Sequence, residues 1–384
     1  MKESPLNIPE LLDLCMRSLA GSTPDLLNCA LVARSWVVPA QKQIFYSPRA
    51  TNGRIYTTES VSVGLNEALC SNPRLVTYVG AIDLCVGDLL GFTKLATFAK
   101  LCAHDFTQLR SLVLYILCEV PTDDLQRILS SPSLRFLKLV VVYPKPPADM
   151  YFPPPSHFLV HCSPALRHVD LMYTPTGPPP DNLLDAFIPV KSARLDHSVL
   201  PSWLYPFDLS ELKALALEKI TSIPWDLFPI QNLQILEIGA SNELAPVELS
   251  SLPSLELLRF NLPACIPQMI STSLATMPRS SKIHTILLSY TPNRDAPPNE
   301  LDMADFEVID DILAGLELSL HPIVEFEYHV ESHDTFNLRR AKRWEAKLKD
   351  AFQIAVSRNR FRFVMRNGTQ DEVFHWWRDL VFKL

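Results

Sequence analysis

Two short segments carry histidines and carboxylates at spacings that could serve a metal ion. The alternation in EFEYHVESH, residues 325–333, predicts a strand on which every second residue lies on one face: Glu325, Glu327, His329, Glu331 and His333. Two histidines and a carboxylate can bind a divalent metal, but next-but-one residues on a flat strand seldom converge on one ion. In HFLVH, His157 and His161 would converge on a helix, which the neighbouring prolines disfavour. We therefore expect a solvent-facing strand at 325–333 and no metal site in either segment.

The motifs of common enzymes are missing from the sequence. The 10 glycines form no dinucleotide-binding, P-loop or nucleophile-elbow motif. The 8 cysteines never occur as a C-x-x-C pair and mostly lie in apolar runs, which favours reduced, buried thiols. We predict a non-catalytic protein with no catalytic residues, no bound metal and no cofactor.

Composition and charge favour a soluble intracellular protein, in the cytoplasm or the nucleus. The first residues lack the apolar core of a signal peptide, and no stretch reaches the roughly 20 apolar residues of a membrane helix. The formal net charge of -7 gives no overall attraction to nucleic acids or anionic membranes. We therefore predict no nucleic-acid partner and no membrane partner.

A repeating aliphatic pattern runs through the middle of the chain. Nine units carry aliphatic or similar residues at first, fourth and sixth positions, and successive units start 21 to 32 residues apart. The fourth and sixth positions are Ile82/Leu84, Leu112/Leu114, Leu137/Leu139, Val169/Leu171, Ala193/Leu195, Leu215/Leu217, Leu236/Ile238, Leu258/Phe260 and Ile286/Leu288. Each unit predicts a short strand whose last two apolar side chains point inward and are buried only against neighbouring units.

With these spacings, residues 75 to 291 resemble the leucine-rich repeat family. The resemblance implies an α/β fold, a horseshoe-like leucine-rich-repeat solenoid. The Asn or Cys that the family places after the sixth position is replaced in this sequence, by Leu117, Val142, Thr174, Ile220 and Ser241.

The segments between the strands predict helices, turns and loops. Residues 121–133 predict a helix with Thr122 as its cap and Leu125, Ile128 and Leu129 on one face. Two proline-rich stretches, 144–155 and 175–180, are expected to be loops, and a polyproline ligand for another domain is the alternative.

Polar residues alternate with the buried aliphatics and are expected to line the concave face of the solenoid. They are Asp83, Tyr115, Lys138, His168, Asp170, Arg194, Asp196, Glu218, Glu237, Arg259 and Asn261. All but Asp83 and Asn261 are our candidate substrate-binding residues, because a row of mixed charge suits a polar protein segment. The alternative is a merely solvated sheet face.

The first fifty residues break this rhythm and predict three short helices. Asn7 and Glu10 stand at capping-box spacing, and Thr23 is expected to cap a second helix ahead of Pro24. A third apolar set has Pro39 near its beginning. Three short helices make a small core, which usually packs onto something else.

Two motifs in this region resemble the F-box, specifically the F-box-like variant joined to leucine-rich repeats in many fungal proteins. They are the Pro-Glu-Leu-Leu start at residues 9 to 12 and the Val-x-Arg-x-Trp element at Val32, Arg34 and Trp36. The resemblance covers residues 4 to 48 and departs at Asn7-Ile8, where many members have Leu-Pro.

The resemblance implies binding to the small adaptor protein of a cullin-RING ubiquitin ligase and, through it, to a cullin. The residues that would be buried against the adaptor, or support that surface, are Ile8, Pro9, Leu11, Leu12, Leu31, Val32 and Trp36. A plain helical cap that shields the first repeat is the alternative.

The charge distribution changes abruptly near the end of the chain. Residues 295–334 hold twelve acidic and no basic residues, whereas residues 339–366 hold ten basic and two acidic ones. A helix is expected with Leu338, Ala341, Trp344, Leu348 and Phe352 on its buried face, followed by a strand at 360–366. Basic residues between phenylalanines can bind RNA, but the acidic block offers an internal partner.

The domain boundaries follow from these patterns. We predict an F-box-like module at 1–50, a connector at 51–74, degenerate repeats at 75–295 and a C-terminal repeat or cap region at 296–384. The predicted function is that of a substrate receptor of a cullin-RING ubiquitin ligase, acting on an unknown protein substrate. The alternative is a recognition or scaffold protein with no ligase association.

Overall fold

The structure, a computed structural model, describes fourteen stretches of the chain and two isolated residues. They are residues 8–19, 22–46, 58–87, 92–118, 120–141, 161–173, 188–196, 207–218, 230–239, 246–262, 267–290, 303–316, 321–330 and 335–367, with residues 159 and 318. The chain divides into two compact units. The first comprises Met1–Pro189 with Ser202–Phe207, and the second comprises Val190–Pro201 with Asp208–Leu384.

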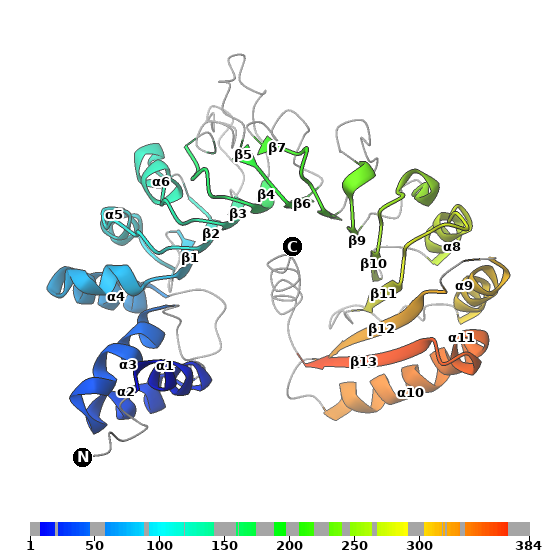
Figure 1. The fold of residues 1–384 in the computed structure, drawn as a ribbon, viewed down its shortest axis with the longest axis horizontal. Helices are drawn as coiled ribbons and strands as arrows, with labels where there is room; N and C mark the ends of the chain where they lie inside the picture. The colour runs from blue at the N-terminus through cyan, green and yellow to red at the C-terminus, as the bar shows by residue number, and fades with distance from the viewer. Residues whose placement is uncertain are drawn as a thin grey trace, which may run out of the picture. The chain divides into compact units, whose positions relative to one another are not determined.

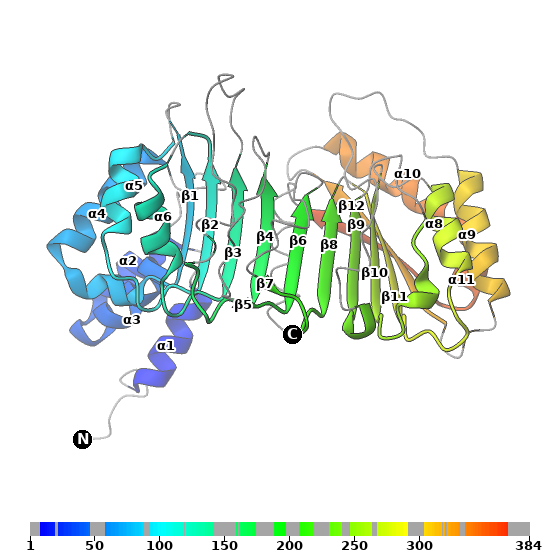
Figure 2. The same cartoon turned by 90° about the horizontal axis from the view of Figure 1, so that it is seen from above.

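The fold is mixed α/β, with an 11-stranded sheet in the order β1-β2-β3-β4-β6-β8-β9-β10-β11-β12-β13 (Figure 2). The strands of the first unit are β1 (Ala81–Val86), β2 (Ser111–Ile116), β3 (Phe136–Val141) and β4 (His168–Tyr173). Those of the second unit are β6 (Ser192–Asp196), β8 (Ala214–Glu218), β9 (Ile235–Gly239), β10 (Leu257–Leu262), β11 (Thr285–Tyr290), β12 (Ile323–Val330) and β13 (Phe361–Asn367). Two short strands, β5 (Ile188–Pro189) and β7 (Phe207–Asp208), pair separately.

The register of the sheet follows the aliphatic repeat. In the first unit, Leu114 lies opposite Leu84 and Leu139, and in the second unit Leu236 lies opposite Leu215 and Leu258. The strand pairs whose register is described are all parallel. The fourth and sixth positions of all nine predicted units are buried, which confirms the strand prediction.

Helices of the first unit lie on one side of its strands (Figure 1). They are α4 (Glu59–Ser71), α5 (Leu95–Cys102) and α6 (Thr122–Leu129), with the 3-10 helix η2 (Pro73–Tyr78). In α6, Leu125, Ile128 and Leu129 are buried as predicted. The predicted cap is wrong, because Thr122 is the first helical residue and Pro121 takes the cap position without a side-chain hydrogen bond.

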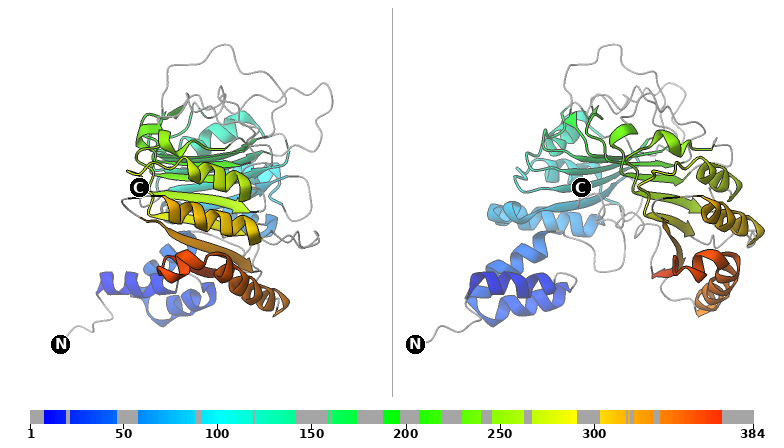
Figure 3. Two further views of the ribbon diagram at one scale, coloured as in Figure 1. Left: turned by 90° about the vertical axis from the view of Figure 1, so that its right-hand side faces the viewer. Right: turned by 45° about the vertical axis from the view of Figure 1, so that its right-hand side comes forward.

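The N-terminal module consists of α1 (Pro9–Ser18), α2 (Thr23–Val32) and α3 (Arg34–Tyr46), which pack on one another (dark blue in Figure 3). Met16, Leu26 and Ala40 form its core. The module is tied to the start of the sheet, since the amide of Gly80 donates to the carbonyl of Tyr46 at 2.9 Å.

Three local details of this module differ from the sequence predictions. The side chain of Ser22, not Thr23, caps α2 and accepts from the amide of Asp25 at 3.4 Å. The helix α3 begins at Arg34 and contains Pro39 as its sixth residue, where the missing amide leaves the helix one backbone hydrogen bond short. No side chain caps α1, where Ile8 takes the cap position, and Asn7 lies outside the described residues.

Helices α8 (Pro267–Ala275), α9 (Met303–Gly315), α10 (Thr335–Ala351) and α11 (Gln353–Ser357) belong to the second unit, which also holds the 3-10 helices η5 (Ile230–Asn232) and η6 (Leu249–Ser251). Aromatic residues join α10 to the sheet, because Trp344 stacks on Tyr290 and Phe326 with ring centroids 5.4 and 6.3 Å away. The predicted helix and the predicted strand at 360–366 are therefore confirmed as α10 and β13. Among the helices that the structure describes, none has the length and apolar character needed to cross a bilayer.

Candidate functional site

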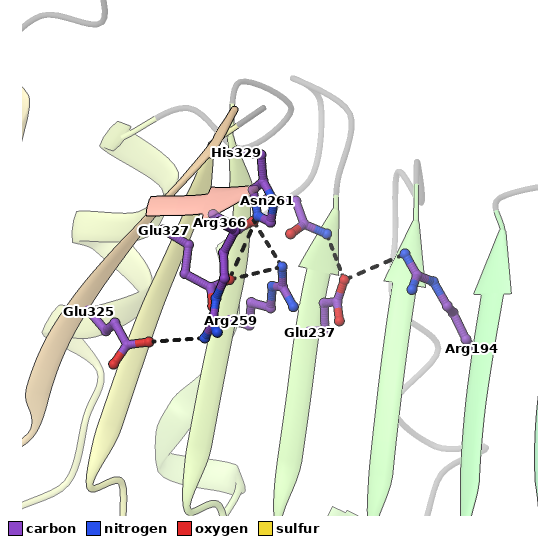
Figure 4. A network of polar contacts seen from close by, with 9 residues as sticks. Arg194, Glu237, Arg259, Asn261, Glu325, Glu327, His329 and Arg366 are labelled. Atoms are coloured by element: carbon purple, nitrogen blue, oxygen red, sulfur yellow. Dashed lines mark hydrogen bonds and ion pairs between the residues drawn. The ribbon is translucent and has the colours of Figure 1, made fainter. Parts of the chain in front are cut away.

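A network of polar side chains lies on one face of the strands of the second unit (Figure 4). These residues alternate with the buried apolar residues that pack against the helices, so they occupy the opposite face of the sheet. The network comprises Arg194 on β6, Glu237 on β9, Arg259 and Asn261 on β10, Ser289 on β11, Glu325, Glu327 and His329 on β12, and Arg366 on β13.

Glu327 is the centre of this network. Its Oε1 accepts from Arg366 through Nη2 at 2.8 Å and Nε at 2.9 Å, and its Oε2 lies 3.3 Å from Nη2 of Arg259. Arg366 also lies 3.8 Å from Glu325. One carboxylate is thus held by two guanidinium groups from strands on either side of β11 and β12, an arrangement that fixes its position strongly.

A second carboxylate, Glu237, extends the network across β9. Its Oε1 accepts from the side-chain amide of Asn261 at 2.7 Å and lies 3.6 Å from Nη2 of Arg194. The side chains of Glu237 and Arg259 have no exposed surface, and that of Glu327 is 1% exposed. Burial of a single charge costs several kcal/mol, so the three arginines and three glutamates of the network must compensate one another.

His329 completes the network as a neutral imidazole. Burial is the main reason that its pKa falls to about 4, and the cations Arg259 and Arg366 lower it further against the opposing effect of Glu327. Nε2 of His329 lies 3.0 Å from the hydroxyl of Ser289, which itself accepts from Arg259 at 2.9 Å. Because a hydroxyl can accept two hydrogen bonds and donate one, either atom can be the donor between Ser289 and His329, and the tautomer of the imidazole decides which.

Burial also shifts two charged groups of the network. It lowers the pKa of Arg259 although Glu237 and Glu327 oppose the shift. It raises the pKa of Glu325, helped by Glu327 and opposed by Arg366 and Arg362. The network thus stores electrostatic strain that only close ion pairing offsets.

The expected solvent-facing strand at 325–333 is wrong for Glu327 and His329, which are 1% and 5% exposed. Strand β12 is not an open edge, because it pairs with β11 on one side and β13 on the other. Within the described stretches, no three metal-binding side chains are grouped to hold an ion. His157, Glu331 and His333 lie outside those stretches.

The candidate substrate-binding residues form two sets of contacts. In the first unit, Nζ of Lys138 lies 3.6 Å from Asp170 and 5.5 Å from the centre of the Tyr115 ring, and His168 is buried nearby on β4. In the second unit, Arg194 joins the network described above. The side chains of Asp196 and Glu218 are outside what the structure describes.

The expectation that these residues form an open recognition surface is wrong for Glu237 and Arg259, which have no exposed area. Lys138, His168 and Asp170 are also buried, while Tyr115 and Arg194 are partly exposed. Lys138 and Asp170 lie at the same register of neighbouring strands, whereas Arg194 pairs with Glu237 across β8 and Arg259 pairs with Glu327 across β11. Sequence reasoning missed Ser289, which follows the sixth position of the ninth repeat unit, and Arg366, which a repeat alignment continued past residue 291 would have placed beside β12.

The candidate adaptor-binding residues fall into exposed and buried groups. Ile8 and Leu11 are each 43% exposed, Leu31 is 85% exposed and Val32 is 67% exposed. Leu12 is buried, and Trp36 is partly buried against the module's core. The side chain of Pro9 is not described.

Two further exposed residues of this module, Leu14 and Leu27, were missed. Of the ten large apolar residues that are exposed in the described stretches, six lie between residues 8 and 32. They are Ile8, Leu11, Leu14, Leu27, Leu31 and Val32. The first two helices therefore present most of the chain's described exposed apolar surface.

No protein-family model matches this sequence, and no curated protein matches it either.

Proposed function

We propose that this protein is a non-catalytic substrate receptor of a cullin-RING ubiquitin ligase. The N-terminal module binds the adaptor as an F-box-like domain, and the strands and helices that follow form a degenerate leucine-rich-repeat solenoid that recognises a protein substrate. The protein would act in the cytoplasm or nucleus, where such ligases operate.

The exposed apolar surface of α1 and α2 is the observation that carries the proposal. Leu27 and Leu31 lie four residues apart and so share one face of α2, while Ile8, Leu11 and Leu14 follow one another at three-residue spacing. Clustered exposed apolar residues usually mark a protein interface. Complete burial of one such leucine contributes about 1.5–3 kcal/mol, so a few of them can sustain a stable complex.

The remaining motif residues support that surface from within. Leu12 is buried, and Trp36 packs against the core formed by Met16, Leu26 and Ala40. Their packing fixes the helices that carry the exposed leucines. Preorganisation of this kind reduces the entropy cost of binding.

A helical cap on the first repeat explains less of the structure. The hydrogen bond between Gly80 and Tyr46 joins α3 to the start of the sheet, as a cap requires. However, a cap has a polar outer face, and Leu31 at 85% exposure does not fit that role. Adaptor binding explains the exposed leucines, and the attachment of α3 to the sheet is compatible with either role.

The repeat register supports a solenoid. Aliphatic residues at equivalent positions pair along the sheet, as with Ile82 and Leu112 or Leu258 and Ile286. Each strand thus buries its apolar side chains against the next repeat and not in a separate core.

Co-purification of the full chain with the ligase adaptor tests the proposal. We expect the wild type to form a complex at micromolar concentration, and Leu11→Asp or Leu31→Asp to weaken it at least tenfold, since each places a charge in an apolar interface (about 1.4 kcal/mol per tenfold change). Val308→Asp is the matched control, because Val308 is an exposed apolar residue of α9, at 48%, outside the module.

Two results would contradict the proposal. One is a wild-type chain that never captures the adaptor, which would favour a recognition or scaffold protein. The other is capture by Leu31→Asp as strong as by Val308→Asp.

A further inference from the structure

The outward face of α10 carries four basic residues. Arg339, Lys342, Arg343 and Lys347 are all exposed. Lys342, Arg343 and Lys347 follow Arg339 by three, four and eight residues, so all four share one side of the helix. The stretch from Arg339 to Lys347 extends over about 12 Å at 1.5 Å per residue.

These four cations have no acidic partner in the part of the chain that the structure describes. The ion pair described on α10 joins Lys349 to Glu345 at 2.8 Å, on the flank of the helix. Elsewhere in the basic segment, Arg366 is paired with Glu327, and Arg360 donates to the carbonyl of His321. Among the described residues, the acidic block thus supplies partners for Arg366 on β13 and none for these four cations of α10.

The helix presents this face rigidly. Ala341, Trp344 and Leu348 are buried on the opposite side, and Trp344 is stacked on Tyr290 and Phe326. The helix therefore cannot rotate its basic residues toward the sheet, nor can it turn an apolar face into a lipid bilayer.

We propose that the basic face of α10, defined by Arg339, Lys342, Arg343 and Lys347, binds a short acidic segment of the protein substrate. Extended peptide advances about 3.3 Å per residue, so roughly four residues span the face. Arginine and lysine side chains bind carboxylates through charge-assisted hydrogen bonds. The inference rests on the proposed receptor function for the identity of the partner as a ligase substrate.

A nucleic acid fits this surface less well than an acidic peptide. Helix α9 packs beside α10 and exposes Glu307 and Asp311, which would repel a long polyanion that runs past the basic face. Recognition of single-stranded nucleic acid also relies on exposed aromatic rings, whereas Trp344 and Phe352 are buried. The formal net charge of -7 adds a further general repulsion.

Fluorescence anisotropy on the full chain with a labelled eight-residue Glu/Asp peptide tests the inference. A Gln/Asn peptide of the same length and a single-stranded oligonucleotide of equal charge are the comparison probes. We expect the acidic peptide to bind best, and Lys342→Glu with Arg343→Glu to weaken it roughly tenfold through loss and reversal of two surface ion pairs.

Arg74→Glu with Lys100→Glu is the matched control, because both residues are exposed, lie in the first unit and change the net charge equally. Equal weakening by the control pair overturns the inference, as does tighter binding of the oligonucleotide. Adaptor capture is measured in parallel, and we expect Lys342→Glu with Arg343→Glu to leave it unchanged. A chain that binds the acidic peptide but not the adaptor would refute the receptor function. The basic face of α10 would then still be a binding site for acidic peptides.

Discussion

Acidification will destabilise the second unit through His329. The pKa of this imidazole is about 4 in the folded protein, mainly because of burial, against an ordinary value of 6.5. The unfolded state therefore binds a proton more readily between these values, and the stability present above pH 6.5 is lost as the pH falls toward 4. Integration of this linkage gives a loss of about 2 kcal/mol at pH 5 and about 3 kcal/mol at pH 4.

The structural cause is the positive surroundings of a buried ring. Arg259 on β10 and Arg366 on β13 are the cations, Glu327 on the same strand is the anion 3.8 Å from Nε2, and the hydroxyl of Ser289 on β11 shares a hydrogen bond with Nε2. Protonation would add a fourth positive charge to a network that already holds three arginines and three glutamates.

Urea denaturation of wild type and His329→Gln at pH 7, 6 and 5 provides the measurement. Glutamine keeps a hydrogen-bonding side chain beside Ser289 but does not titrate, so the difference in unfolding free energy between the two proteins isolates the histidine. Glu325, whose pKa burial raises, has the opposite effect, since its stability contribution grows as the pH falls, and it is present in both proteins.

We expect the wild type to lose about 2 kcal/mol relative to His329→Gln between pH 7 and pH 5. A difference that stays constant with pH would refute the account, and one of opposite sign would mean that His329 is charged and paired with Glu327. Titration of the His329 ring by NMR gives the folded-state pKa directly.

Two other perturbations test the packing of the second unit by urea denaturation. Arg259→Met leaves two buried carboxylates short of a cation and should lower the free energy of unfolding by about 3–5 kcal/mol. The double variant with Glu327→Gln should recover part of this loss. Strictly additive losses would mean that Arg259 and Glu327 do not interact. The carboxylate of Asp310 accepts hydrogen bonds from the amides of Ile354 and Ala355 at 2.7 and 3.0 Å. Asp310→Ala should therefore lower the free energy of unfolding by about 1–3 kcal/mol. An unchanged urea midpoint would show that water replaces the carboxylate at the start of α11.

The strands could be predicted from the sequence because their signal is local. An aliphatic pair at fourth and sixth positions determines which face of a short strand is buried, whatever the rest of the fold. The search for aliphatic residues at first, fourth and sixth positions missed β12 and β13. In these strands Phe326 and Phe363 take the sixth position, and the polar residues His321 and Arg358 take the first. Their inward positions nonetheless pair in register with the earlier repeats.

The burial of the charges could not be predicted in this way. Alternating glutamates and histidines on β12 have the same local pattern as a solvent-facing strand. Their partners, Arg259 and Arg366, lie 68 and 39 residues from Glu327 along the chain, so only the strand register brings them together. The residue that caps α2 was predicted wrongly for a related reason. Ser22 and Thr23 are both good caps, and the backbone conformation selects between them.

The buried network also explains how the basic helix is positioned. If β13 slipped by one residue against β12, Arg366 would move to the aromatic face and leave Glu327 without its closest cation, at a cost of several kcal/mol. The pairing of Arg366 with Glu327 thus favours a single register for β13. Phe326 of β12 packs on both Phe363 of β13 and Trp344 of α10, so the same strand contacts the neighbouring strand and the helix. Glu327, which is 1% exposed and cannot contact a substrate itself, thereby helps to hold the strands against which the helix with the exposed cations packs.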